Sequence, residues 1–291
     1  MEVIRAENAG ACYGVQRALD IADEVAAACV RAFTLGPLIH NPVVVADLAA
    51  RGIESVDDVD EIANDGSASS GLGGDAQPTV IIRSHGVTPE VRARLDATGL
   101  PVRDATCPHV LRAQKASAQL GAAGCTVVVV GEAGHPEVEG LVAYARREGA
   151  RTVVASHAGE VPADLCAPVG VVVQTTQRRE ALDDVLGAIR AQGIEPQVKD
   201  TVCDATRERQ DAAAAMAREV DAVVVIGGRN SSNTTRLAEI CSAICPRTFH
   251  IQDAPEIDPA WFAGCKRVGV TAGASTPESQ IQAVVALLES L

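Results

Sequence analysis

Short apolar runs, bounded by glycine or polar residues, recur along the whole chain. Runs of Val and Ile occupy residues 80–82, 127–130, 171–173 and 223–226, and Val-Gly-Val occupies 268–270. Runs of this length and composition are typical of strands buried on both faces. Alanine-rich stretches such as 112–123 and 207–218 lie between them, and their composition favours helices. The alternation of strand and helix predicts an α/β fold built from modules with parallel sheets.

One cysteine recurs three times within a repeated frame, at Cys12, Cys107 and Cys203, with spacings of 95 and 96 residues. A glycine follows each cysteine after 24 residues, and a polar cluster begins four residues after each glycine. The repeat predicts three similar modules, with limits at 1–103, 104–199 and 200–291. Such modules can bring three thiolates together at a pseudo-threefold axis, which suits a metal or cluster with one open coordination position.

The second and third copies of the repeat agree further around the cysteine. Asp104 and Asp200 precede Cys107 and Cys203 by three residues, and Gln114 and Gln210 follow them by seven. The polar clusters themselves are His40-Asn41, His135-Pro136-Glu137 and Ser231-Ser232-Asn233.

Composition and charge narrow the classes of function. Hydrophobic residues make up 47% of the chain and aromatic residues only 2%, so the core must consist of Val, Ile, Leu and Ala. The net charge of −13 argues against nucleic acid as a partner, because phosphate backbones are bound by basic faces. No apolar run approaches the 18 or so residues of a membrane span.

The expected location is cytoplasmic, because the first ten residues lack the charged-then-apolar pattern of a signal peptide. Nine cysteines in a cytosolic chain favour free thiols or metal ligands over disulfides. The six outside the repeat are expected to be small buried apolar residues: Cys29, Cys125, Cys166, Cys241, Cys245 and Cys265. Residues 64–78 are rich in Gly, Ser and Asp, which predicts a surface loop.

The polar clusters each follow a predicted strand and begin a predicted helix. Free backbone N–H groups and the positive end of the dipole make helix N-termini good anion sites. Polar side chains also follow strands, at His85, Thr175 and Ser275, and the carboxyl ends of parallel strands are where α/β folds bind ligands. The pattern predicts a phosphate or diphosphate site without Lys or Arg. Each Ser or Asn taken alone is explained as well by helix capping.

Glu137 is the one carboxylate in these clusters. A carboxylate is a poor phosphate ligand, so beside an anion pocket Glu137 is a candidate proton donor. The competing interpretation is a first-turn Glu that stabilises the helix dipole. For the three repeated cysteines, the residues alone leave Zn²⁺, an iron–sulfur cluster or no metal open.

Several strings resemble the LytB/IspH family of 4-hydroxy-3-methylbut-2-enyl diphosphate reductases. They run in order over essentially the whole chain: AGACYGVQRA around Cys12, LIHN from Leu38, SHGV from Ser84, DATCP around Cys107, AGHPEVEG from Ala133, QTT from Gln174, Cys203 with Ala205-Thr206, NSSNTTRLAE from Asn230 and GVTAGASTP from Gly269. AGHPEVEG and VTAGAS are long and highly specific.

The resemblance implies a trefoil of three α/β modules around a [4Fe–4S] cluster with three Cys ligands, Cys12, Cys107 and Cys203, and one open iron. It implies reductive dehydroxylation of an allylic alcohol diphosphate to isopentenyl and dimethylallyl diphosphates, the last step of the non-mevalonate pathway. Electrons would come from ferredoxin or flavodoxin. The open iron would bind the substrate oxygen.

By the same resemblance, the diphosphate would be held by His40, His85, His135, Ser231, Ser232, Asn233 and Ser275. Glu137, with Thr175 and His135, would supply protons at the hydroxyl end.

Three residues depart from the family pattern: Tyr13, Glu132 and Asp204. Tyr13 and Asp204 adjoin predicted cluster ligands and keep two alternatives open. One is a divergent paralogue acting on another small alcohol diphosphate, and the other is a non-catalytic iron–sulfur sensor. A Zn²⁺ hydrolase is a more distant alternative.

Overall fold

The computed structural model describes residues 1–28, 31–64 and 77–291, and for residues 63–64 it describes the backbone alone. Most of the surface loop predicted at 64–78 lies outside the described residues. The chain consists of two compact units. Unit 1 comprises Met1–Val15, His40–Pro42 and Cys203–Leu291, and unit 2 comprises Gln16–Ile39 and Val43–Val202.

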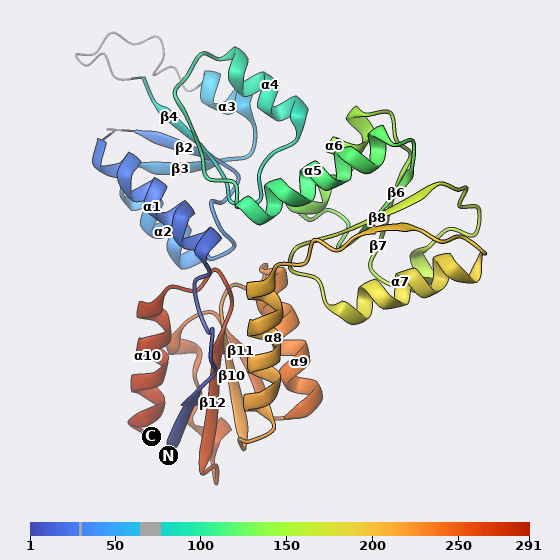
Figure 1. Ribbon diagram of the computed structural model, residues 1–291. Coiled ribbons are helices and arrows are strands. Elements are labelled where there is room, and N and C mark those ends of the chain that lie inside the picture. Colours follow the sequence, from blue (N-terminus) through green and yellow to red (C-terminus); the bar gives the residue numbers. More distant parts are fainter. Residues whose placement is uncertain (29–30, 65–76) are drawn as a thin grey trace. The chain divides into compact units, whose positions relative to one another are not determined.

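Unit 1 contains one four-stranded parallel sheet, in the order β1-β12-β10-β11. Its strands are β1 (Glu2–Arg5), β10 (Ala222–Ile226), β11 (Thr248–Ile251) and β12 (Arg267–Ala272). Its helices are α8 (Asp204–Ala217), α9 (Ser232–Ile244) and α10 (Glu278–Glu289), with short 3₁₀ turns η2 (Ala254–Glu256) and η3 (Pro259–Phe262). Helices α8 and α9 pack on one face of the sheet and α10 packs on the other (Figure 1).

Unit 2 contains two further four-stranded parallel sheets, in the orders β3-β2-β4-β5 and β7-β6-β8-β9. The first has the strands β2 (Ala32–Leu35), β3 (Ile53–Val56), β4 (Thr79–Ile82) and β5 (Val102–Asp104), with helices α1 (Tyr13–Ala28), α2 (Pro42–Ala50), α3 (Val59–Asn64) and α4 (Pro89–Ala97). The second has β6 (Thr126–Val130), β7 (Thr152–Ala155), β8 (Val169–Val173) and β9 (Gln197–Lys199), with α5 (Pro108–Ala122), α6 (Pro136–Arg147), η1 (Ala158–Glu160) and α7 (Arg179–Ala191). The prediction of three similar α/β modules with parallel sheets is confirmed.

The apolar runs form central strands because both faces of each sheet are covered by helices. In β6, Val127 and Val129 pack with residues of α5 and α6, while Val128 and Val130 pack with α7 on the other face. Successive side chains of a strand point to opposite faces, so a strand covered on both sides needs an uninterrupted run of valine.

The sheet membership of the first strand differs from the expected module limits. Residues 2–5 fall within the expected module 1–103, yet β1 pairs with β12 in the sheet of the third module. It occupies the edge position that β5 and β9 occupy in the other two sheets. In all three sheets the strand at this edge leads into the repeated cysteine, so each cysteine follows the sheet of the preceding module in cyclic order.

Two of the remaining cysteines are less buried than expected. Cys166 is exposed and Cys265 is half-buried, whereas Cys125, Cys241 and Cys245 are buried as predicted. Cys166 lies in a loop before β8, where no helix covers it. Cys29 lies outside the described residues.

The repeated glycine Gly131 ends β6 at a point of close packing. A Cβ atom there would lie 2.6 Å from Val138 Cγ2 and 2.8 Å from Gln174 Oε1. We expect Gly131→Ala to lower the free energy of unfolding by about 1–3 kcal/mol, the usual cost of overpacking. Urea unfolding measures this.

The matched control is Gly187→Ala. Gly187 lies within α7, and a Cβ atom there would meet no heavy atom within 4 Å. Because alanine favours helix over glycine, this variant should gain about 0.5–1 kcal/mol. Equal effects of the two substitutions would show that packing at Gly131 does not constrain the end of the strand.

Candidate functional site

The three repeated cysteines lie at the starts of helices. Cys107 and Cys203 are the N-caps of α5 and α8, and neither side chain makes a capping hydrogen bond. Cys12 directly precedes α1. All three residues are half-buried, and none of them forms a disulfide among the described residues. A thiolate at a helix N-terminus is stabilised by the positive end of the helix dipole, so these positions suit metal ligation.

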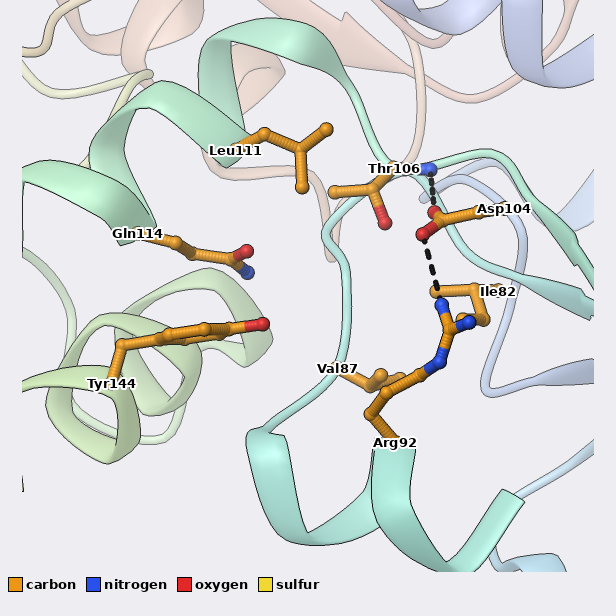
Figure 2. A pocket seen from close by; sticks show the side chains of 8 residues that line it. All are labelled: Ile82, Val87, Arg92, Asp104, Thr106, Leu111, Gln114 and Tyr144. Carbon is orange, nitrogen blue, oxygen red and sulfur yellow. Dashed lines mark hydrogen bonds and ion pairs between the residues drawn. The ribbon is translucent and has the colours of Figure 1, made fainter. Parts of the chain in front are cut away.

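The aspartates that precede two of the cysteines shape the backbone of their loops. Asp104 Oδ1 accepts a hydrogen bond from the Thr106 N–H at 2.9 Å, and Asp200 Oδ1 accepts one from the Val202 N–H at 3.2 Å. Each carboxylate is also paired with an arginine of the preceding helix, Arg92 at 3.3 Å and Arg179 at 3.3 Å. Figure 2 shows the Arg92–Asp104–Thr106 arrangement. The repeated Asp is therefore explained as a loop-forming residue.

The cysteine amides connect two cysteines to strand ends. The Cys107 N–H donates to the Ser84 carbonyl at 2.9 Å, and the Cys12 N–H donates to the Ala274 carbonyl at 3.3 Å. These carbonyls directly precede His85 and Ser275, two of the predicted diphosphate-binding residues. Each of these hydrogen bonds lies within one unit and holds a thiol beside a polar strand end.

Glu137 is held by Thr175 in the interior of unit 2. The Thr175 N–H donates to Glu137 Oε1 at 2.6 Å, and the Thr175 hydroxyl donates to Oε2 at 2.8 Å. Only 1% of Glu137 is exposed. Burial raises the pKa of Glu137 to about 7, against the opposing effect of the Thr175 hydrogen bonds. A carboxyl that titrates near neutral pH can act as a general acid.

His135 lies two residues before Glu137 and is the N-cap of α6. Its Nδ1 accepts from the Glu137 N–H at 3.1 Å, which in the neutral ring leaves the proton on Nε2. The ring of His85 packs edge-on against it, with centroids 5.3 Å apart. Unit 2 thus brings His85, His135, Glu137 and Thr175 close together, although they come from separate motifs.

The serine–asparagine cluster lies at the N-terminus of α9 in unit 1. Ser231 is its N-cap and accepts from the Thr234 N–H at 3.4 Å, so the capping interpretation holds for this residue. Asn233 is 4% exposed, yet neither polar atom of its amide has a hydrogen-bond partner among the described residues. Thr234 Oγ1 is buried and has no partner within the described part of the chain either. Unsatisfied buried polar groups are costly, so these two side chains are available to a polar ligand.

Thr234 is a residue that the sequence analysis did not single out. Its signal was its place directly after Ser-Ser-Asn, within the first turn of the same helix. Close packing is required around it, because a Cβ atom at Gly227 would lie 2.7 Å from Thr234 Oγ1.

The segment His40–Pro42 belongs to unit 1. Asn41 Nδ2 donates to the Ser275 carbonyl and to Gln280 Oε1, both at 2.8 Å. A Cβ atom at Gly228 would lie 2.6 Å from the His40 carbonyl oxygen, so glycine permits this approach. The structure therefore places His40 beside the end of β10 and Asn41 beside Ser275.

A pocket of about 40 Å³ lies behind the Cys107 loop in unit 2 (Figure 2). Thr106, Gln114 and Tyr144 are among its lining residues. Gln114 is 3% exposed and its Nε2 has no partner among the described residues. The volume and the polar lining suit an ordered water molecule.

The raised pKa of Glu137 predicts a pH dependence of stability. Because the folded pKa of about 7 exceeds the ordinary 4.5, the folded state binds this proton more tightly than the unfolded chain. The contribution of Glu137 to stability is thus full below about pH 4.5 and is lost as the pH rises through about 7. We expect the difference in unfolding free energy between wild type and Glu137→Gln to fall by about 1.4 kcal/mol for each pH unit crossed in this window.

Denaturant unfolding of both proteins at several pH values from 5 to 8 measures this difference. A difference that does not change with pH would mean that Glu137 titrates in the ordinary range.

The structure defines each predicted site residue within its own unit. Unit 1 holds Cys12, His40, Cys203, Ser231, Ser232, Asn233 and Ser275, and unit 2 holds His85, Cys107, His135, Glu137 and Thr175. None of the helices among the described residues combines the length and apolar composition that a membrane span requires.

Comparison with known proteins gives a consistent family assignment. The profile of the family described as LytB protein matches residues 3–289. A 4-hydroxy-3-methylbut-2-enyl diphosphate reductase of Geobacter sulfurreducens is 49% identical over 287 residues, covering 98% of this chain and 96% of that protein. One of Geotalea daltonii is 45% identical over 291 residues, covering 100% and 98%.

Solved structures agree. The structure of an (E)-4-hydroxy-3-methyl-but-2-enyl diphosphate reductase, described as the terminal enzyme of the non-mevalonate pathway, matches with a TM-score of 0.69 at 40% identity and covers 100% of both chains. The reductase from Plasmodium falciparum has the same fold, with a TM-score of 0.86 at 22% identity over 99% of this chain and 87% of that one. The resemblance found in the motifs is confirmed, and the chain belongs to the LytB family.

Proposed function

We propose that this protein is a 4-hydroxy-3-methylbut-2-enyl diphosphate reductase. It removes the hydroxyl of an allylic alcohol diphosphate as water, with two electrons and two protons, and forms isopentenyl and dimethylallyl diphosphates. The observation that carries the proposal is the buried Glu137, with its pKa raised to about 7 and both oxygens held by Thr175. The names of the relatives in the family support the same reaction.

Cys12, Cys107 and Cys203 are proposed to hold an iron–sulfur cluster of the [4Fe–4S] type. The donor set fits, because three half-buried cysteines lie at helix starts in one repeated frame. The buried guanidinium of Arg209 is also compatible with a cluster at these cysteines, because it lies close enough to Cys12 and Cys203 for an electrostatic interaction. When bound, the cluster supplies the electrons and a Lewis-acidic iron for the substrate oxygen.

The chain's own residues are proposed to bind and orient the diphosphate. His40, His85, His135, Ser231, Ser232, Asn233 and Ser275 offer neutral donors. Asn233 supports this role most directly, because its buried amide has no hydrogen-bond partner in the part of the chain that the structure describes. Fixed donors on the diphosphate would orient the allylic alcohol, and positioning of this kind lowers barriers by about 7–11 kcal/mol in favourable cases.

Glu137 is proposed to hold the proton that leaves with the hydroxyl. Thr175 keeps the carboxyl in one orientation by donating to both of its oxygens. His135 fixes the first turn of α6 by accepting from the Glu137 N–H at Nδ1, which in the neutral ring places its proton on Nε2. The raised pKa keeps a substantial protonated fraction of Glu137 at neutral pH.

The test is anaerobic turnover of 4-hydroxy-3-methylbut-2-enyl diphosphate by protein with a reconstituted cluster, using a reduced low-potential dye. Formation of both five-carbon diphosphates is the expected result. A bound cluster without turnover would overturn the proposal and favour the paralogue or the sensor. Tyr13, which is 70% exposed beside Cys12, would then be the first residue to replace. Cytosolic location and electron delivery by ferredoxin or flavodoxin stay predictions.

A further inference from the structure

Arg209 joins the surroundings of two repeated cysteines within unit 1. It lies on α8, the helix that begins after Cys203. Its Nη2 donates to the Gly10 carbonyl at 2.8 Å, and its Nη1 donates to the Ala205 carbonyl at 3.1 Å. Gly10 is two residues before Cys12, and Ala205 is two residues after Cys203. One guanidinium therefore ties the Cys12 loop to the start of the Cys203 helix.

Arg17 makes the equivalent connection within unit 2. It lies on α1, five residues after Cys12. Its Nη1 donates to the Thr106 carbonyl at 3.2 Å and its Nη2 donates to the Asp104 carbonyl at 3.1 Å. Thr106 directly precedes Cys107. The helix that follows one cysteine thus holds the loop that leads into another.

The third helix of the repeat carries an arginine in the corresponding place. Arg112 on α5 is five residues after Cys107, and it lines the same surface pocket as Asp200 and Thr201. Those two residues lead into Cys203. The helix after each cysteine therefore places an arginine near the loop before the next, in the cyclic order Cys12, Cys107, Cys203.

Arg209 is a buried cation. It is 3% exposed, and both of its described hydrogen bonds go to backbone carbonyls. A buried cation costs several kcal/mol unless anions lie near it. Burial lowers the pKa of Arg209, so the cation is held in the interior at a cost. The two carbonyl oxygens that accept from it lie at Gly10 and Ala205, two residues from Cys12 and from Cys203.

We propose that Arg209 and Arg17 are positioning residues for the cysteine ligands. Arg209 fixes the backbone before Cys12 and after Cys203, and Arg17 fixes the backbone before Cys107. The inference rests on the proposed function in assigning a cluster to these cysteines. The backbone contacts hold without it, and they make the inference testable in the metal-free protein.

The experiment compares wild type with Arg209→Gln, Arg209→Lys and Arg17→Gln. Arg218→Gln is the matched control, because exposed Arg218 is the C-cap of the same helix and its guanidinium donates to the Ala214 carbonyl at 3.2 Å, far from both cysteine loops in the sequence. Two quantities are measured. One is amide hydrogen exchange at Gly10 and Cys12 in the metal-free protein, where these N–H groups donate to the Ala272 and Ala274 carbonyls at 3.3 Å. The other is the rate of iron release to a chelator from the reconstituted protein.

We expect Arg209→Gln to speed exchange at Gly10 and Cys12 and iron release by roughly tenfold or more, the effect of losing one hydrogen bond from a charged group. Arg209→Lys should recover part of both, and Arg218→Gln should change neither. Arg17→Gln should speed iron release and exchange at Cys107 and leave exchange at Gly10 unchanged. Arg17→Gln also keeps the inference testable if Arg209→Gln does not fold. Arg17 is only half-buried, so its replacement disturbs the interior less.

Unchanged exchange and unchanged iron release in Arg209→Gln would overturn the inference. Failure of the proposed cluster assignment is distinct, since wild-type protein would then bind no cluster, and failure of the proposed reaction would appear as a bound cluster without turnover. The exchange measurements would still decide in that case whether the arginines hold the loops.

Discussion

Glu137→Gln is expected to lower the rate of anaerobic turnover by about 10²–10⁴-fold while the protein keeps its cluster and its affinity for substrate. Glutamine matches the size of the buried side chain, and its Oε1 can still accept from the Thr175 N–H while its NH2 group donates to the Thr175 hydroxyl, but it carries no acidic proton. The loss should therefore appear in kcat with little change in KM. Steady-state kinetics with a reduced low-potential dye, together with iron analysis, measures all three quantities.

The rate of the wild-type enzyme should also depend on pH in a definite direction. A general acid works only while protonated, and the pKa of Glu137 is raised to about 7 by burial. Turnover that depends on this proton is therefore expected to fall as the pH rises through about 7. The residual activity of Glu137→Gln should not fall in this way as the pH rises.

Glu139→Gln is the matched control. Glu139 lies two residues further along α6 and is exposed, so its replacement removes a carboxylate of the same helix without touching Thr175. It should keep nearly wild-type turnover. Full activity in Glu137→Gln would remove Glu137 from the mechanism.

Cys107→Ser is expected to abolish most iron binding and to reduce turnover by about 100-fold or more, because even outer-sphere changes at metal sites commonly cost 10–100-fold. Cys107 is the N-cap of α5 and makes no capping hydrogen bond, so serine keeps the helix start intact. The loss should therefore be confined to metal binding. Iron content, visible absorbance of the reconstituted protein and the urea unfolding midpoint separate the two effects.

Cys166→Ser provides the comparison. Its thiol is exposed, lies outside the repeat and donates only to the Asp164 carbonyl, at 3.7 Å. This variant should keep wild-type iron content and turnover. Wild-type iron content in Cys107→Ser would show that the repeated cysteines do not form one ligand set.

Much of the fold was predictable from local pattern. The valine runs at 127–130 and 223–226 became central strands, and the spacing of Cys12, Cys107 and Cys203 matched three similar sheets. Hydrophobic periodicity and the propensity for helix or strand depend on residues that are neighbours in the sequence, so they can be recognised from the sequence alone. The sheet to which residues 2–5 belong could not be predicted from local pattern. Strand β1 pairs with β12 at the far end of the chain, and this pairing assigns it to the third sheet.

The candidate site, like the fold, was predictable from the sequence only in part. Repeated polar clusters and family motifs pointed to Glu137, Thr175 and His135 as separate residues. Their contacts, and the burial that raises the pKa of Glu137, required the folded chain, because desolvation depends on everything packed around a group.

Two roles came from tertiary structure alone. The repeated Asp104 and Asp200 were visible as a pattern, but only their hydrogen bonds to Thr106 and Val202 explain them as loop-forming residues. Arg209 carried no sequence signal, since its partner Gly10 is 199 residues away along the chain. Residue types and their spacing are properties of the chain, whereas the partner of a buried charge is chosen by the packing of distant segments.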